Sequence, residues 1–313
     1  MTDHLARIEQ YVDKVEDWEQ LPDEPLVSVC ITTYNHEDFI ADAIEGALMQ
    51  ETDFPYEIII AEDNSTDATG DIVLDYQRRY PGRIRLRLAE ENLYSKCRRY
   101  PIWGLHGASR GKYIAQCDGD DYWTGAKKLQ RQIDVLEANP DFAGSFHETK
   151  DVDYESGEVI EVRAENTSDT ISAEDTISRG THFHTSSFVY RQDAVEWPEW
   201  SPEFVSGDMI LFSVVAASGD LVKVDRIMSV RRNHNESLTK TSEHKSGFHD
   251  RRIRLMKSLN RWHGDEFDSK LKSVISFHKR KGPSLLDRLR MKLGIRTRIR
   301  RIMNCLYKEY NVG

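Results

Sequence analysis

The sequence predicts an α/β fold in which a largely parallel sheet is covered by helices on both faces. Strand-like runs alternate with amphipathic helical segments from residue 26 onward, and this order requires parallel strands joined by right-handed crossovers. The strand-like runs are apolar on both faces, as strands inside such a sheet are. Acidic turns directly follow two of these runs, at the edge where an α/β sheet binds its ligand.

Four strands and two helices are expected before residue 120. The expected strands are residues 26–33, 56–61, 83–88 and 112–117. Asn35 is expected to cap the first helix, in which apolar residues recur at helical spacing between residues 40 and 48. The second helix follows residue 67 and carries Ile72, Val73 and Tyr76 on one side.

The alternation becomes less regular after residue 121. The expected elements are a helix at 126–138, a strand at 187–190, a helix opening at 207–208, a strand at 221–230 and a helix within 242–262. Residues 163–176 are polar and contain few large apolar side chains, so we expect a flexible loop there.

The charge of the chain is distributed unevenly. The 313 residues carry a net charge of −10, yet residues 279–313 contain eleven basic and two acidic side chains. An acidic body argues against nucleic acid as its partner. Residues 283–308 form a basic amphipathic tail, which favours peripheral contact with a membrane surface. Packing of this tail on the acidic body of the same or a neighbouring chain is the alternative, and it leaves a homo-oligomer open.

Cysteine usage and hydropathy favour a cytoplasmic protein. The four cysteines have no metal-binding or redox spacing, as expected for reduced thiols. The longest nearly apolar run, residues 209–217, is far shorter than the ~20 residues that span a bilayer. The N-terminal residues lack the layout of a secretory signal. We therefore expect a cytoplasmic location, with contact at the inner face of the membrane left open by the tail.

The two acidic turns, residues 62–67 and 118–121, are expected to face one site. Both follow parallel strands, and the carboxyl ends of such strands meet at the same edge of the sheet. Clustered carboxylates repel one another unless a cation or hydrogen-bond donors face them. Oxygen ligands at this spacing suit Mg²⁺ or Mn²⁺ bridging a diphosphate.

The acidic turns have other interpretations. Either turn alone could be an ordinary turn or helix cap, because aspartate and asparagine favour both. A calcium-binding loop starting at Asp63 fits badly, since Ala68 stands where glycine is required and Leu74 where glutamate is required.

Three motifs in order resemble a known enzyme family. They are residues 27–35 (Val-Ser-Val-Cys-Ile-Thr-Thr-Tyr-Asn), residues 62–67 (Glu-Asp-Asn-Ser-Thr-Asp) and residues 111–121 (Gly-Lys-Tyr-Ile-Ala-Gln-Cys-Asp-Gly-Asp-Asp). Tyr122-Trp123 and Lys128-Leu129 follow them. Together these motifs resemble the inverting glycosyltransferase family 2 over residues 25–131, with Glu62 in place of the family's first aspartate.

The resemblance implies a GT-A-type fold with a Rossmann-like sheet fused to an acceptor-binding half. Residues 25–240 would form the glycosyltransferase domain, with a nucleotide-sugar half at 25–122 and an acceptor half at 123–240. An acidic helix at residues 1–24 would precede it, and a helical region at 241–313 would follow. The implied reaction moves one sugar from a nucleoside-diphosphate sugar to a hydroxyl of a glycan or lipid-linked acceptor, as in bacterial surface-glycan synthesis.

The resemblance also implies roles for residues of the first half. Thr32 and Tyr34 would line the nucleoside pocket, and Asp63 would accept a hydrogen bond from the base. Asp118 would contact the ribose or the sugar, and Asp120 would hold Mn²⁺ or Mg²⁺. A UDP-sugar is the favoured donor, although thymine and guanine stay open as bases.

Two residues of the second half are candidates for chemistry. Asp208 stands before an apolar helix in a Gly-Asp element that resembles one in the family, which implies that it is the general base. An ordinary helix N-cap is the alternative. His234 follows a strand where related enzymes carry a basic residue, so it would complete the metal shell or steady the leaving group. An exposed loop histidine is the alternative for His234.

Aromatic residues offer candidates for the acceptor side. His182 and His184 are expected to share one strand face before residue 187, which suits an acceptor-lining loop, plain burial or an adventitious metal. Trp200 could stack on a sugar ring, although core packing is the commoner fate of tryptophan.

Two rival functions differ in class from this interpretation. A sugar-1-phosphate nucleotidyltransferase would carry a glycine-rich, lysine-containing loop after the first strand, whereas residues 33–37 read Thr-Tyr-Asn-His-Glu. A non-catalytic sugar-nucleotide-binding scaffold at a membrane surface would bind a donor without releasing free nucleoside diphosphate.

Overall fold

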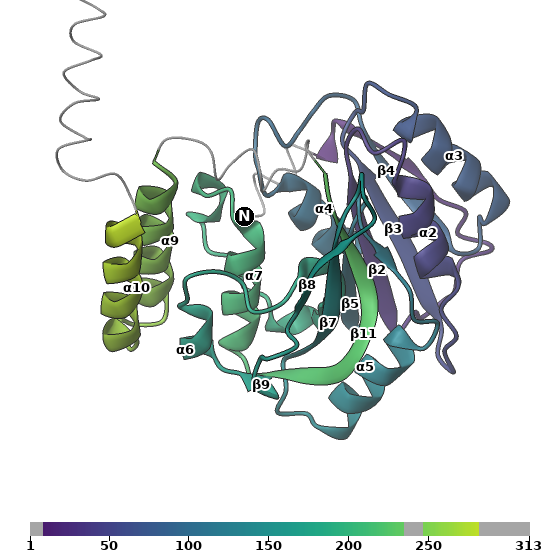
Figure 1. The fold of residues 1–313 in the computed structure, drawn as a ribbon. Coiled ribbons are helices and arrows are strands. Elements are labelled where there is room, and N and C mark those ends of the chain that lie inside the picture. The colour runs from purple at the N-terminus through teal and green to yellow at the C-terminus, as the bar shows by residue number, and fades with distance from the viewer. Residues whose placement is uncertain (1–8, 235–246, 282–313) are drawn as a thin grey trace, which may run out of the picture.

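A computed structural model of the protein describes residues 9–234 and 247–281, which form one mixed sheet with helices on both faces (Figure 1). Its strands are β1 (Val12–Val15), β2 (Val27–Thr33), β3 (Tyr56–Glu62), β4 (Ile84–Ala89), β5 (Tyr113–Asp118), β6 (Tyr122–Trp123), β7 (Gly144–Asp153), β8 (Val159–Arg163), β9 (Thr170–Ile171), β10 (Val189–Arg191) and β11 (Leu221–Asn233). The strand order is β1-β4-β3-β2-β5-β10-β7-β11-β6, with β8 paired to β7 and β9 to β11.

The parallel part of the sheet follows the sequence prediction. β2 lies between β3 and β5 and is parallel to both, and β4 is parallel to β3. The register places Thr32 of β2 beside Ala61 of β3 and Asp118 of β5. The carboxyl ends of these strands therefore meet at one edge of the sheet.

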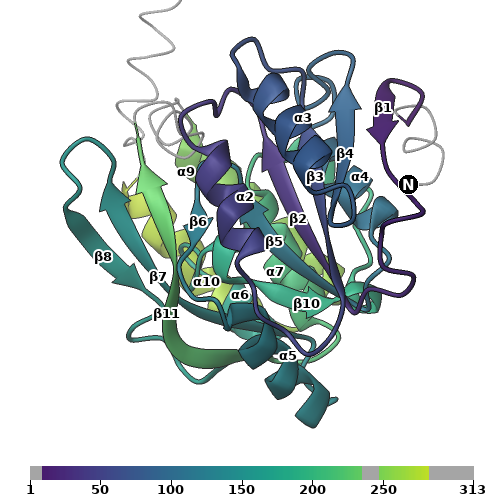
Figure 2. The ribbon, with the colours of Figure 1, turned by 90° about the vertical axis from the view of Figure 1, so that its right-hand side faces the viewer.

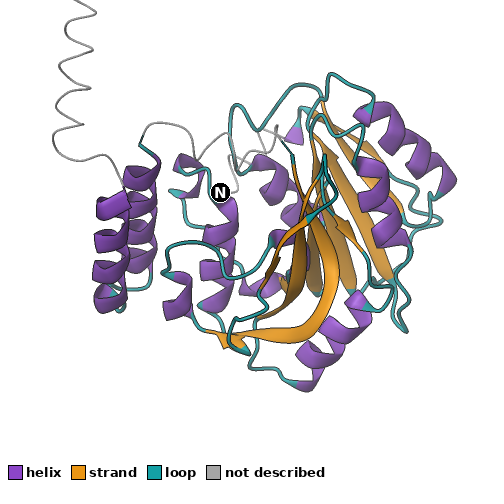
Figure 3. Cartoon of the chain, in the orientation of Figure 1, coloured by secondary structure: helices purple, strands orange, loops and turns teal. Residues whose placement is uncertain are grey.

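Helices cover the two faces in separate layers (Figures 2 and 3). They are α2 (Ile40–Leu48), α3 (Thr69–Arg79), α4 (Tyr100–Ala108), α5 (Lys128–Ala138), α6 (Ala173–Thr176), α7 (Gly207–Ala216), α9 (Phe248–Trp262) and α10 (Asp268–Lys281). Apolar side chains of α2, α3 and α5 pack on the face that carries Val29 and Ile31. The opposite face packs against α4 and α7, and α9 and α10 pair on the outer side of α7.

The second half of the sheet brings the end of a long strand to the acidic turn after β5. β10 is antiparallel to both β5 and β7, and β11 is parallel to β7. The two-residue strand β6 directly follows the acidic turn and pairs with β11, where Trp123 faces Ser229 and Tyr122 faces Val230. The residues just after this pairing on β11 are thereby held beside the turn.

The prediction of a helix over residues 1–24 is wrong for its central part. Val12–Val15 is a strand that pairs antiparallel with β4. Two arginines of β4, Arg85 and Arg87, are buried and form ion pairs with Glu16 and Glu9. The acidic residues of this segment thus balance the charges of buried arginines on β4 and do not form the polar face of a helix.

Three further local expectations are corrected. α2 begins at Ile40 with Phe39 at its N-cap, so Asn35 does not cap it. Instead the Asn35 side-chain oxygen accepts a 2.8 Å bond from the Thr66 N–H, which ties the ends of β2 and β3 together. The expected loop at 163–176 contains β9 and α6. α4 was not foreseen, because its proline and two glycines weaken a helical pattern.

The basic amphipathic tail predicted at residues 283–308 lies outside the described residues. α9 and α10 lie in the region 241–313, which was expected to be helical. No helix in residues 9–234 and 247–281 is long and apolar enough to cross a membrane.

A buried ionic network fixes one side of the parallel strands. Glu57 of β3 is fully buried and accepts hydrogen bonds from the Ser28 hydroxyl at 2.7 Å, from Arg85 at 3.1 Å and from Arg110 at 2.6 Å. Each donor comes from a different segment, so this one carboxylate joins β2, β4 and the loop before β5 through β3.

Glu57→Ala should therefore lower the free energy of unfolding by about 3–5 kcal/mol, because it leaves the buried Arg85 without one of its charge partners. Urea denaturation measures this change. Glu51→Ala is the matched control, since its pair with Lys127 is exposed and contributes about 0–1 kcal/mol. Equal losses in the two variants would contradict the network's role.

Candidate active site

The acidic turn after β5 packs directly on the end of β2. The Thr32 hydroxyl donates to Asp118 over 3.3 Å, and the Gly119 N–H donates to the Thr32 carbonyl over 2.8 Å. A Cβ atom at Gly119 would lie 2.8 Å from Thr33 and from Nδ1 of His36. Glycine is required here because the turn lies against another strand's end with no space for a side chain.

The aspartates of this turn occupy different electrostatic states. Burial raises the pKa of Asp118 to about 7, and repulsion from Asp120 adds to the rise. Burial, Asp120 and Asp118 together raise the pKa of Asp121 well above its ordinary value. Burial opposes ionisation of Asp120 too, but the hydrogen bond from His234 and the attraction of His36 and His234 hold its pKa below the ordinary value. Asp120 is therefore the ionised carboxylate of the turn.

His234 comes from the end of β11 and meets Asp120. Its Nε2 atom lies 3.0 Å from Asp120 Oδ2, and the ring packs on Phe39 with centroids 4.9 Å apart. Arg232, two residues before His234, donates a hydrogen bond to the Asp120 carbonyl at 3.1 Å. The structure thus brings together two predicted residues that are more than a hundred positions apart.

Asp121 and His184 form a second, inner group with Asp118. Asp121 accepts from the Arg232 N–H at 3.0 Å, and its other oxygen lies 3.3 Å from His184 Nδ1. That same Nδ1 accepts from the Ser186 N–H at 3.3 Å. Burial and the nearby Arg231 lower the pKa of His184 to about 3, so its imidazole is neutral.

Both groups contain atoms that bind divalent cations, but they differ in availability. Ligand atoms of Asp118, Asp121 and His184 all lie within 4.8 Å of one another. The Asp121 oxygens and the His184 nitrogen are already engaged by protein groups, and Asp121 is almost fully buried. Asp120 and His234 are bonded to each other, but they lie in a less enclosed place, with 19% and 9% of their side chains exposed. The donor set of this outer pair suits Mn²⁺ or Mg²⁺ better.

Asp63 holds the loop that follows β4. Its two carboxylate oxygens accept from the N–H groups of Leu93 at 2.8 Å and Tyr94 at 3.0 Å. Burial raises the pKa of Asp63 to about 6, although these two bonds act in the opposite direction. Tyr34, at the end of β2, has 39% of its surface exposed and offers an open aromatic face at the same edge.

Asp208 lies on the first turn of α7 and is not its N-cap. Ser206 occupies the cap position, and no side chain caps the helix. Within the described residues, the Asp208 carboxylate has no hydrogen bond or ion pair. Its charge nevertheless acts on Asp118, contributing after burial and Asp120 to the raised pKa of that residue. Asp208 is therefore close enough to Asp118 to interact with it electrostatically.

Arg99, which the sequence reasoning missed, positions the segment before Asp208. Its buried guanidinium donates to the carbonyls of Ser201 at 3.3 Å and Val205 at 2.9 Å, and also to that of Phe204. A Cβ atom at Gly207 would lie 1.7 Å from this guanidinium. The loop whose N–H groups bind Asp63 continues to Arg99, and Arg99 in turn binds the segment before Asp208. This loop therefore connects the Asp63 side of the site to the Asp208 side.

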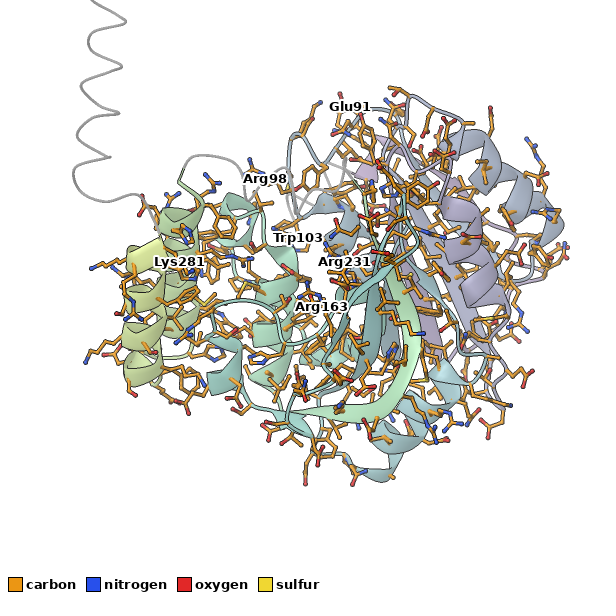
Figure 4. The ribbon with its side chains drawn as sticks, viewed as in Figure 1. Glu91, Arg98, Trp103, Arg163, Arg231 and Lys281 are labelled. Carbon is orange, nitrogen blue, oxygen red and sulfur yellow. The ribbon has the colours of Figure 1, made fainter. Side chains whose placement is uncertain are left out.

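Arg231 is a second residue that sequence reasoning did not assign. It lies on β11 near Arg163 of β8 (Figure 4), and Asp151 accepts from both, at 3.0 Å and 2.9 Å. The positive charge of Arg231 acts on Asp118 as well as on the rest of the acidic turn. The pair of arginines at the end of β11 is the signal that could have found it.

The acceptor-side candidates are only partly brought to the site. Residues 182–184 form no strand, and His184 caps the 3₁₀ turn Thr185–Ser187 beside Asp121. His182 points elsewhere, with Nε2 at 2.8 Å from the Asp175 carbonyl. Trp200 packs edge-on against Phe204 with ring centroids 5.6 Å apart. The expected shared face of His182 and His184 is therefore wrong, because the segment turns between them.

Comparison with known proteins adds a family and a set of relatives. A family model described as Glycosyl transferase family 2 matches residues 28–198, which include both acidic turns. An uncharacterized protein of Mycobacterium tuberculosis is 31% identical over 215 residues, covering 66% of this chain and 59% of that protein. The chain thus spans less than two thirds of the length of this relative. The Escherichia coli UDP-Glc:alpha-D-GlcNAc-diphosphoundecaprenol beta-1,3-glucosyltransferase WfaP is 37% identical over 124 residues, covering 37% of this chain and 43% of that enzyme.

Two solved structures share the fold. S. aureus TarS in complex with UDP-GlcNAc superposes with a TM-score of 0.59 at 19% identity, covering 80% of this chain and 71% of that one. The mannosyltransferase PcManGT from Pyrobaculum calidifontis, in complex with GDP-Man and Mn²⁺, has a TM-score of 0.54 at 14% identity and covers 95% and 88%. These similarities confirm the GT-A-type fold.

Gly207→Ala should destabilise the protein by about 1–3 kcal/mol, because the added Cβ would displace the Arg99 guanidinium from its buried place. Gly107→Ala in α4 is the matched control, since no atom lies within 4 Å of its added Cβ. The control should be neutral or stabilising, as alanine favours a helix over glycine. Thermal melting of both variants measures the difference, and an unchanged melting temperature for Gly207→Ala would contradict the contact.

Proposed function

Because the chain belongs to glycosyl transferase family 2, we propose that it transfers one sugar from a nucleoside-diphosphate sugar to an acceptor hydroxyl by single displacement with inversion. The observation that carries this proposal is the meeting of the two halves of the domain. The acidic turn after β5 lies at the carboxyl edge of the sheet, and Asp208 acts on it electrostatically from α7. A donor site and a base thereby face each other.

The nucleoside of the donor binds at the ends of β2 and β3 in this proposal. Thr32, Tyr34 and Asp63 line this edge, and Tyr34 offers an exposed ring for stacking. TarS was solved with UDP and UDP-GlcNAc, and WfaP is named for a UDP-Glc donor, which supports a UDP-sugar. Asp118 contacts the ribose or the sugar.

Asp120 and His234 are the proposed ligands of Mn²⁺ or Mg²⁺. Such an ion, when bound, neutralises the charge of the diphosphate leaving group. Neighbouring residues of the chain keep this site suited to a cation and a diphosphate. The pKa of Asp120, held below its ordinary value against burial by His234 and His36, keeps the carboxylate ionised. Arg231 adds a positive charge beside the acidic turn, and Asp151 restrains its orientation.

Asp208 is the proposed general base. Its carboxylate accepts the proton of the acceptor hydroxyl while that oxygen forms a bond to the anomeric carbon. The bond between that carbon and the diphosphate breaks, and its electron pair leaves with the phosphate oxygen. Arg99 supports this step by holding the backbone at residues 201–205, so that the base approaches at a defined angle.

The acceptor is a glycan or a lipid-linked sugar, and the physiological role is bacterial surface-glycan synthesis in this proposal. The names of several relatives support it, including a putative teichuronic acid biosynthesis glycosyltransferase, TuaG, of Bacillus subtilis, 36% identical over 113 residues. His184 and Trp200 stay as acceptor-side predictions, and His182 does so despite its bond to Asp175.

Asp208→Asn should keep donor binding and lower transfer by ~10² to 10⁴, the usual effect of losing a general base. Calorimetry with a nucleoside diphosphate and Mn²⁺ measures binding, and product formation measures transfer. Normal turnover by this variant would place the base elsewhere. A wild-type protein that binds donor yet never releases nucleoside diphosphate would instead support the non-catalytic scaffold.

Asp120→Ala should abolish Mn²⁺-dependent binding of the nucleoside diphosphate, because the ion loses its ionised ligand. His234→Ala should weaken the same binding less, since the ionised Asp120 ligand remains. Titration with Mn²⁺ at fixed nucleotide concentration compares both variants with the wild type. Wild-type metal dependence in Asp120→Ala, together with its loss in an Asp121→Asn variant, would transfer the assignment to the inner group.

A further inference from the structure

A group of basic side chains gathers where the α9–α10 pair meets α7. The group consists of Arg179, His249, Arg252 and His278, and we call it the basic cluster. His249 lies at the start of α9 and His278 near the end of α10, with their Nδ1 atoms 3.0 Å apart. Figure 4 labels Lys281 at this same end of α10, which adds a further exposed positive charge.

The basic cluster lies next to the proposed base. The Arg252 guanidinium contacts the sulfur of Met209, the residue directly after Asp208 on α7. Arg179 lies over the ring of Phe277, with its guanidinium carbon 4.6 Å from the centroid. The cluster therefore touches α7 one residue after the proposed base.

The part of the chain that the structure describes pairs no acid with the charges of the basic cluster. Within residues 9–234 and 247–281, no ion pair joins a carboxylate to any member of the cluster. Two buried nitrogen atoms, Arg252 Nε and His278 Nε2, have no hydrogen-bond partner. Burial lowers the pKa of His278 to about 4, and the positive charges of His249, Arg252 and Arg179 add to this effect. An anion is the ligand that would balance the positive charges of the cluster.

We propose that the basic cluster binds a phosphate group of the acceptor substrate, an assignment that rests on the transfer activity proposed above. Guanidinium groups donate in a planar fork that matches phosphate oxygens, and imidazole N–H groups add further donors. The cluster would thus select acceptors that carry a phosphate near the hydroxyl that is glycosylated.

Binding is tested on the full chain with glycerol phosphate as the probe and EDTA present to remove divalent cations from the acidic turns. The side-chain NMR signals of His249 and His278 should shift with glycerol phosphate and not with sodium chloride at equal ionic strength. Arg179→Ala should weaken the affinity by about 10-fold or more, because a hydrogen bond to a charged group is lost. Arg254→Ala, which removes an exposed arginine elsewhere on α9, is the matched control and should bind like the wild type.

Arg252→Gln tests the half-buried arginine of the cluster and should also weaken binding. If this variant fails to fold, Arg179→Ala still decides, since Arg179 is exposed. Equal shifts with chloride, or an equal loss in Arg254→Ala, would overturn the proposal. Binding to phosphatidylglycerol vesicles without binding to glycerol phosphate would also overturn the proposal, because the cluster would then bind a membrane surface.

The role in acceptor selection is tested by transfer to a sugar and to its phosphorylated form. The wild type should prefer the phosphorylated acceptor, and Arg179→Ala should lose this preference while keeping its acceptor-independent release of nucleoside diphosphate. An unchanged preference would overturn the acceptor assignment. If glycerol phosphate binds but no donor is ever cleaved, the proposed function fails and the cluster remains a phosphate site with another ligand.

Discussion

Repulsion among the three carboxylates that follow β5 is the constraint around which the molecule is arranged. Asp118, Asp120 and Asp121 lie within four positions, and burial makes their mutual repulsion stronger. Donors from distant segments oppose it: the Thr32 hydroxyl, the Arg232 N–H and the His234 ring. The pairing of β6 with β11 delivers two of these three donors. The mixed half of the sheet thus supplies hydrogen-bond donors that compensate the negative charge at the end of the parallel strands.

The parallel half could be predicted because its signals are local. Buried parallel strands are continuous apolar runs, and each acidic turn stands next to its strand in the sequence. All parallel strands of a sheet end at one edge, so residues that directly follow such strands in the sequence lie near one another at that edge. The link between Asp120 and His234 needed more, namely a family resemblance, because no periodicity relates the end of β5 to the end of β11.

The remainder depended on contacts that sequence patterns do not encode. The acidic N-terminal segment pairs with Arg85 and Arg87. Its charges therefore reflect the needs of the neighbouring strand β4 and do not indicate its own secondary structure. Arg99 carries no motif in isolation, yet its three carbonyl partners lie about a hundred positions away. His182 and His184 differ in fate because a turn separates them, and a two-residue period could not show it. For the acidic segment and for Arg99, a long-range partner decides the role of residues whose local sequence carries no motif.

The N-terminal strand β1 also protects the sheet from aggregation. Without it β4 would be the edge of a flat parallel array, with free N–H and C=O groups open to another chain. β1 occupies this edge with only four residues, and two of them, Asp13 and Lys14, are charged and exposed. A short, charged edge strand is a poor template for further pairing. Expression of the domain from residue 25 onward would therefore leave β4 as an open edge and the buried Arg85 and Arg87 without Glu16 and Glu9.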